Sequence, residues 1–164
     1  MMRRTLYSLA TVGLVGFLAS VPVCAQAPKA DRAADKATVE QTFREYMAAF
    51  SAGDPKKIAT YYNEPMMLVP WGKVIGTKAE LETWVQTVRR DLQSRGIADY
   101  ALEQLAVKLL GQDGAMASFL VQRRAKDGSV LAVVAGSYFL RRTETGWKIA
   151  VIAVYPPADL IKLD

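Results

Sequence analysis

Residues 38–55, TVEQTFREYMAAFSAGDP, decide how this chain folds. Apolar residues recur here at the spacing of one helix face: Val39, Phe43, Tyr46, Met47 and Phe50. This period predicts an amphipathic helix from residue 38. Gly53 supplies its C-terminal stop. Asp54 and Pro55 then start a second, short helix, with Asp54 as N-cap and proline at the first helical position.

The remaining elements follow downstream in a regular order. Short apolar runs predict strands at 66–70 and 73–75, and a capping box of Thr77 and Glu80 opens a third helix that Gly96 closes. Four longer runs separated by turn residues then predict strands at 100–110, 115–124, 130–141 and 147–155. Helices followed by an antiparallel meander predict the α+β class, with three N-terminal helices against a strongly curved sheet.

The N-terminus has the pattern of a secretory signal peptide. Arg3 and Arg4 precede an uncharged apolar run, and Val23 and Ala25 are small residues at the −3 and −1 positions of a cleavage site. We therefore expect removal of residues 1–25 and a periplasmic or secreted protein. A retained membrane anchor and acylation of Cys24 are the alternatives.

Cleavage after Ala25 changes the chemistry of the chain. It removes Cys24, the single cysteine, and it lowers the net charge from +5 to +3 by removing two arginines. The exported part then divides into a polar, flexible leader (26–36), one domain (37–158) and a C-terminal tail (159–164), with no membrane association.

The composition excludes several classes of function. The chain has no histidine, which rules out Ser-His-Asp and Cys-His catalysis and argues against zinc. The glycines stand singly, so no phosphate-binding loop is present, and the arginine pairs are scattered rather than forming the stripe that nucleic acids require. We expect no metal, no cofactor and no nucleic-acid partner.

Two segments carry a family resemblance: YMAAFSAGD at 46–54, and GSYFLRR at 136–142 followed by GWKI at 146–149. Together with the element order, they resemble the nuclear transport factor 2-like superfamily, which includes SnoaL-like cyclases and ketosteroid isomerase-like proteins. The resemblance covers nearly all of residues 38–156. It implies a conical sheet of cystatin-like topology, a pocket inside the cone, and a homodimer formed through the outer sheet face.

The resemblance also assigns roles by position. Tyr46 matches the tyrosine that stabilises an oxyanion in the isomerases, and a structural core tyrosine is the competing interpretation. Val69 stands where the isomerases have their general base, and Ser137 stands near their second oxyanion acid. Glu64 is the remaining carboxylate near the junction of helix and strand, and it is a candidate base or a surface cap.

Successive side chains of a strand alternate between the two sheet faces, and the resemblance to the isomerases indicates which set faces the pocket. Arg124 is expected at its mouth, where it would meet an anionic ligand or pair with a carboxylate. A slip of one residue would invert the assignment. The predicted lining residues are Tyr46, Tyr62, Met67, Val69, Trp71, Trp84, Leu120, Gln122, Arg124, Ser137, Phe139, Val151 and Tyr155.

Three functions are compatible with these residues. The favoured one is non-catalytic binding of a small hydrophobic or weakly anionic molecule, because two of the three isomerase positions are lost. The alternatives are a cyclase or isomerase with a non-standard residue set, and a dimeric protein-interaction module.

The signal peptide leads to a direct test with a thiol reagent. When the full chain is expressed in a bacterial host with an intact export system, the exported protein should begin at Gln26. It should therefore fail to react with a maleimide after denaturation, because Cys24 has been removed. A maleimide-reactive protein of full-chain mass in the membrane fraction would instead indicate a retained anchor.

Overall fold

The computed structural model describes the backbone of residues 29–163 and the side chains from Arg32 to Leu163. The predicted signal peptide lies outside the described residues. The elements follow the predicted order: α1 (Lys29–Ala52), α2 (Pro55–Ala59), β1 (Tyr62–Leu68), η1 (Val69–Trp71), β2 (Lys73–Ile75), α3 (Lys78–Ser94), β3 (Asp99–Leu110), β4 (Gly114–Arg124), β5 (Val130–Thr143), β6 (Gly146–Tyr155) and η2 (Pro157–Asp159).

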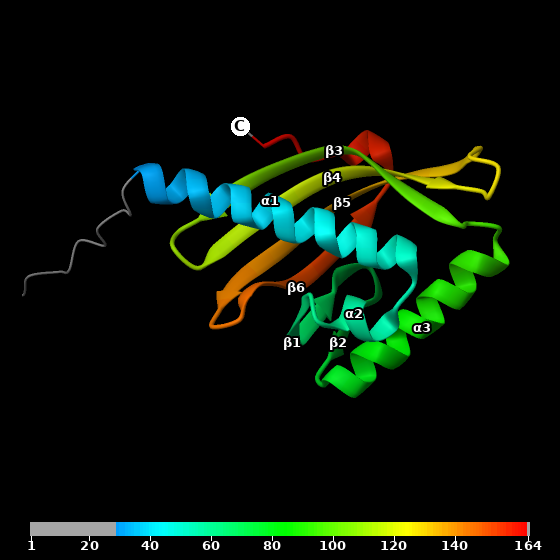
Figure 1. Ribbon diagram of the computed structural model, residues 1–164, viewed down its shortest axis with the longest axis horizontal. Helices are drawn as coiled ribbons and strands as arrows, with labels where there is room; N and C mark the ends of the chain where they lie inside the picture. The colour runs from blue at the N-terminus through cyan, green and yellow to red at the C-terminus, as the bar shows by residue number, and fades with distance from the viewer. Residues whose placement is uncertain (1–28, 164) are drawn as a thin grey trace, which may run out of the picture.

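The strands form one curved, unclosed sheet in the order β2-β1-β6-β5-β4-β3. Strands β3 to β6 make the antiparallel meander that the turn signals predict. Strand β1 pairs with β6 in parallel, which departs from the all-antiparallel expectation. Helix α1 lies across one face of the sheet, and α2 and α3 lie beyond its C-terminal end (Figure 1).

The predicted caps are present. The carboxylate of Asp54 accepts hydrogen bonds from the backbone N–H groups of Lys56 and Lys57 and begins α2. The Thr77 hydroxyl accepts from the Glu80 N–H, and the Glu80 carboxylate accepts from the N–H groups of Gly76 and Thr77. These two N–H groups lower the pKa of Glu80. Both helix starts are thus encoded locally.

Helix α1 begins nine residues before residue 38, the first helical position that the sequence predicts. Residues 29–36, which the sequence analysis assigned to a flexible leader, form its first turns. They are tied to the sheet, because Asp35 forms an ion pair with Arg142 at the end of β5. The Arg142 guanidinium also lies 4.8 Å from the Trp147 ring centroid. This correction rests on contacts between distant residues that local spacing cannot reveal.

The core lies between the helices and the inner sheet face. Phe43 of α1 is fully buried, and its ring centroid lies 4.9 Å from that of Phe119 on β4 and 5.7 Å from that of Tyr138 on β5. Gly136 makes room for this packing, since a Cβ there would lie 2.5 Å from the Phe119 ring. The large apolar side chains therefore face α1.

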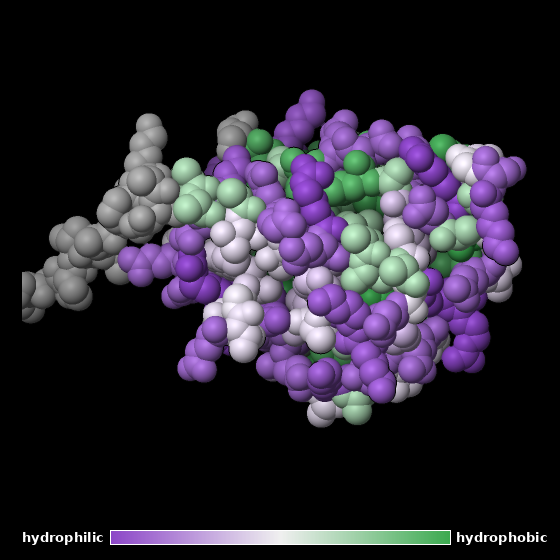
Figure 2. Space-filling view, viewed as in Figure 1, coloured by the Kyte–Doolittle hydropathy of each residue, from purple (hydrophilic) through white to green (hydrophobic). Residues whose placement is uncertain are grey.

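The opposite, outer sheet face carries partly exposed apolar residues, among them Met67 and Phe139. Segment 160–163, after η2, crosses this face beside β3 and β4, where the Ser118 hydroxyl donates to the Ile161 carbonyl. The side of the molecule that carries α1 is mostly hydrophilic, with small scattered hydrophobic patches (Figure 2). Among residues 29–163, no helix is long and apolar enough to cross a membrane.

Candidate functional site

An open cavity of about 470 Å³ lies between the C-terminal half of α1, the helix α3 and the inner sheet face. Aromatic and aliphatic side chains form most of its wall, and charged groups come from α3 and β4. The lining residues are Tyr46, Met47, Phe50, Trp71, Trp84, Val88, Asp91, Leu92, Arg95, Tyr100, Phe119, Val121, Arg123, Val134, Tyr138, Ile152, Val154 and Tyr155.

Two phenols lie at the buried end of the cavity. Tyr46 and Tyr138 are 3% and 7% exposed, and their ring centroids are 5.9 Å apart. The Tyr46 hydroxyl shares a hydrogen bond of 2.9 Å with that of Tyr62, which lies behind the cavity wall. At this end of the cavity the Tyr46 hydroxyl is therefore already hydrogen-bonded to the protein.

These phenols remain neutral at physiological pH. Burial raises the pKa of Tyr46, Tyr62 and Tyr138 well above the ordinary phenol value, because the low-dielectric surroundings disfavour the phenolate. A neutral phenol can donate a hydrogen bond to a ligand oxygen, but it does not serve as a base.

Charged groups gather at the α3 side of the cavity. Asp91 lies in the last turn of α3, and Arg95 is the C-cap residue of that helix; the two form an ion pair of 2.9 Å, so their charges offset each other. Arg123 of β4 is half-buried and stands across the strand pair from Tyr100 of β3. It forms no ion pair with any carboxylate of the described residues.

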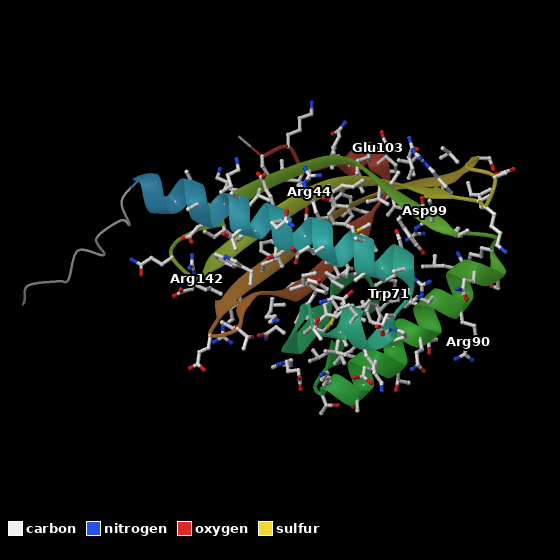
Figure 3. All side chains as sticks on the ribbon, viewed as in Figure 1. Arg44, Trp71, Arg90, Asp99, Glu103 and Arg142 are labelled. Atoms are coloured by element: carbon white, nitrogen blue, oxygen red, sulfur yellow. The ribbon has the colours of Figure 1, made fainter. Side chains whose placement is uncertain are left out.

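Four of the predicted lining residues contribute to the cavity wall: Tyr46, Trp71, Trp84 and Tyr155. Trp71 is 60% exposed and borders the opening, between α1 and α3 in the view of Figure 3. Tyr62 is buried behind the cavity wall, where it contacts the lining residues Tyr46 and Trp84. Met67 and Val69 are 46% and 51% exposed and do not line the cavity.

The prediction for the sheet is inverted. The residues that the sequence analysis placed inside the cone lie instead on the outer face: Leu120, Gln122, Arg124, Ser137, Phe139 and Val151. Their inward neighbours are Phe119, Val121 and Arg123 on β4 and Tyr138 on β5. The slip is one residue, and with a side-chain period of two it moves every side chain to the other face.

Two physical causes produce this inversion. The apolar stripe of α1 needs bulky partners, and Phe119 and Tyr138 bury more apolar surface than Ser118 and Ser137 would. In addition, a bulge at Ala150 pairs Leu140 with Ile149 but Phe139 with Val151, so the inward positions of β6 change from odd to even numbers. One sequence signal could have indicated the inward face of β4: the bulky Phe119 and Val121 alternate with residues such as Ser118.

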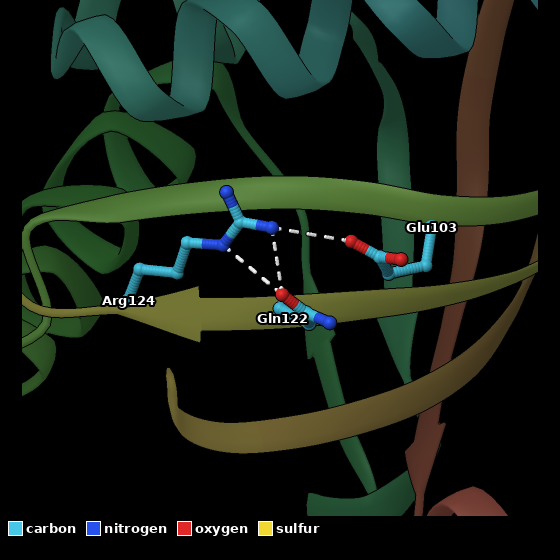
Figure 4. Close-up of polar contacts among 3 residues, drawn as sticks. All are labelled: Glu103, Gln122 and Arg124. Atoms are coloured by element: carbon cyan, nitrogen blue, oxygen red, sulfur yellow. Dashed lines mark hydrogen bonds and ion pairs between the residues drawn. The ribbon is translucent and has the colours of Figure 1, made fainter. Parts of the chain in front are cut away.

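Arg124 therefore does not reach the cavity. Its guanidinium donates to the side-chain oxygen of Gln122 and forms an ion pair of 3.3 Å with Glu103 on β3 (Figure 4). The sequence left two partners open for Arg124, an anionic ligand or a carboxylate of the protein. In the structure its partner is the carboxylate of Glu103 on the neighbouring strand.

Glu64 lies outside the cavity as well. It is exposed, and its carboxylate accepts a hydrogen bond of 3.0 Å from the backbone N–H of Lys78 in the first turn of α3. This is the capping role rather than that of a base facing Tyr46. Across the part of the chain that the structure describes, no cluster of Asp, Glu, His or Cys could hold a metal ion.

Comparison with known proteins gives one family and many structural neighbours. The family model described as NTF2-like protein (DUF6841) matches residues 34–157. None of the curated proteins compared with the chain matches its sequence.

Three solved structures illustrate the similarity in fold. An NTF2-like protein with a cystatin-like fold from Novosphingobium aromaticivorans has a TM-score of 0.62 and 19% identity, over 80% of this chain and 87% of its own. A ketosteroid isomerase-like protein from Erwinia carotovora atroseptica has a TM-score of 0.53 and 20% identity, over 73% and 94%. An NTF2-like protein of unknown function from Shewanella oneidensis has a TM-score of 0.55 and 16% identity, over 75% and 98%. At these identities the neighbours show the fold alone.

The buried phenols predict how stability depends on pH. Their raised pKa values mean that the unfolded chain loses phenol protons first, so the free energy of unfolding should fall above about pH 10. Each buried phenol contributes a slope of about 1.4 kcal/mol per pH unit. Urea unfolding between pH 8 and 11, followed by circular dichroism, measures this fall.

The Tyr46→Phe variant provides the matched comparison for this titration. It should lose about 1 kcal/mol at neutral pH with the Tyr62 hydrogen bond, and its stability should fall less steeply in alkali. An unchanged slope in this variant would mean that Tyr46 titrates as a solvated phenol does.

Proposed function

The chain belongs to the NTF2-like family described as DUF6841, and we propose that it is an exported protein that binds a small hydrophobic or weakly anionic molecule without catalysis. The observation that carries this proposal is the open cavity of about 470 Å³ with its aromatic wall. Its volume lies within the range of about 300–1,000 Å³ that is typical of small-molecule sites.

The composition of the cavity wall favours an apolar ligand. Trp84 contacts Tyr62 edge-on, with ring centroids 6.0 Å apart, and Phe50 contacts Tyr100 in the same way at 5.1 Å. Rings that pack on one another are held in place before a ligand arrives, so little side-chain entropy is lost on binding. Aromatic walls with a few polar groups are the usual form of such sites.

The absence of acid–base chemistry at the site favours binding over catalysis. Asp91 is the single carboxylate of the described lining, and it is paired with Arg95. Val69 is exposed at the surface, and the side chain of Ser137 is on the outer face of β5. The Ser137 hydroxyl is hydrogen-bonded to that of Tyr155, which belongs to the cavity wall at the end of β6. An isomerase or cyclase would need a proton acceptor near Tyr46. The carboxylate of Glu64 instead accepts a hydrogen bond from the backbone N–H of Lys78 in α3.

The proposal includes export to the periplasm or the medium, on the strength of the residue pattern at 1–25. A binding protein without thiols suits an oxidising compartment, because it has nothing to mispair.

A homodimer is a second part of the proposal, and the outer sheet face supports it. The strand pairing places one apolar row across β2, β1, β6, β5 and β4, consisting of Val74, Met67, Val151, Phe139 and Met116. Val74 is 57% exposed and Met67 46% exposed. We propose that a second copy of this chain covers this outer row, as the resemblance implies.

Binding can be tested with the neutral fluorescent probe N-phenyl-1-naphthylamine. The purified domain should enhance the fluorescence of the probe, and Trp84→Ala should weaken binding by roughly tenfold through the loss of one aromatic contact surface. Leu110→Ala, which removes an exposed side chain far from the cavity, is the control and should bind as the wild type does. Equal binding by all three proteins, or by none, contradicts the proposed site.

Native mass spectrometry of protein taken from the export compartment separates binding from catalysis. A co-purified molecule should be recovered chemically unchanged after prolonged incubation with fresh protein. Its conversion to a second compound would support the cyclase or isomerase alternative.

The dimer predicts the effect of charge in the outer row. The double variant Met67→Glu, Phe139→Glu should be monomeric in analytical ultracentrifugation, whereas the wild type should have twice the chain mass, because burying carboxylates in the interface is costly. Val130→Glu, an exposed position outside the row, should remain dimeric. A monomeric wild type would contradict this part of the proposal.

A further inference from the structure

Arg123 lies in the cavity wall and forms no ion pair with any of the described residues. Strand alternation on β4 directs it to the same face as Phe119 and Val121, and it lines the cavity beside Tyr100 and Tyr138. It is half-buried. A half-buried cation is less solvated than one on the open surface, so water and salt screen its interaction with an opposite charge less.

The other charges around the cavity do not satisfy Arg123. Asp91 is held by Arg95 at 2.9 Å. Glu103 pairs with Arg124 on the outer face of the sheet. Within the described residues Arg123 thus forms no ion pair, and the cavity wall that it shares also contains the phenols of Tyr100, its cross-strand partner, and Tyr138.

We infer that the cavity selects amphipathic monocarboxylates, whose apolar body lies against Trp84 and Phe50 and whose carboxylate is bound by Arg123. A planar guanidinium offers two parallel N–H donors, which match the two oxygens of a carboxylate. One unpaired positive charge matches one negative charge, which favours a monoanion over a dianion such as a phosphate monoester. This inference rests on the proposed binding function and names its ligand class.

The chain contains a matched control for this role. Arg124 is the next residue on the same strand and is also half-buried. Its guanidinium lies on the opposite face, where it contacts Glu103 and Gln122. Replacing either arginine by glutamine removes one positive charge from the protein. Only the replacement of Arg123 removes it from the cavity.

The experiment compares two probes of nearly equal shape, 2-naphthoate and its neutral counterpart 2-naphthamide. Dissociation constants are measured by isothermal titration calorimetry for the wild type, Arg123→Gln and Arg124→Gln, and thermal unfolding verifies that all three are folded. The wild type should bind the naphthoate about tenfold more tightly than the amide, as one charge-assisted contact at a partly exposed site provides. Arg123→Gln should bind both probes equally, and Arg124→Gln should keep the tenfold preference.

Each other outcome identifies which claim fails. Equal affinity of the wild type for the two probes overturns the selection of carboxylates and leaves the binding cavity intact. Loss of the preference in Arg124→Gln as well as in Arg123→Gln overturns the role of Arg123, because the net charge would then be responsible. If neither probe binds and N-phenyl-1-naphthylamine does not bind either, the proposed function fails and the inference fails with it.

Discussion

The packing of Phe43 against Phe119 and Tyr138 is the interaction on which the rest of the structure depends. It sets which face of the sheet is buried, because the three rings meet within 4.8 to 5.7 Å of one another between α1 and strands β4 and β5. Gly136 permits this contact by leaving the space that the Phe119 ring occupies. Once these rings face α1, the alternation of the strands determines the direction of every other side chain on β4 and β5.

The cavity is a consequence of this arrangement at the end of α1 where the sheet curves away. Tyr46 and Phe50 continue the buried stripe of the helix, while Trp84 and Leu92 of α3 form the opposite wall. The space between them is bounded by rings that already contact one another, and its buried phenols are neutral. Such a wall provides shape and apolar surface rather than proton transfer, which is why binding is the function that the site supports best.

Adjacent residues on one strand acquire unrelated roles in this fold. Arg123 faces the aromatic cavity without a carboxylate among the described residues, and Arg124 pairs with Glu103 on the outer face. The two faces also differ in what they offer a partner. The inner face contributes to the open cavity, whereas the outer face carries the partly exposed apolar row around Met67 and Phe139, for which we propose a second copy of the chain as partner.

The sequence by itself determined the order of the elements, the caps at Asp54 and Thr77, the inward stripe of α1 and the resemblance to the family, because these follow from short-range spacing that survives in any tertiary context. It also indicated Tyr46, Trp71 and Trp84 at the cavity, since each lies on or beside an element whose inner side is marked by the helical period or by the turn. Only the tertiary structure decided which face of β4, β5 and β6 is concave, and hence that Arg123 rather than Arg124 lies in the cavity. The physical reason is that a strand with apolar residues on both faces is compatible with either orientation, and the choice is made by the fit of distant rings and by one bulge at Ala150.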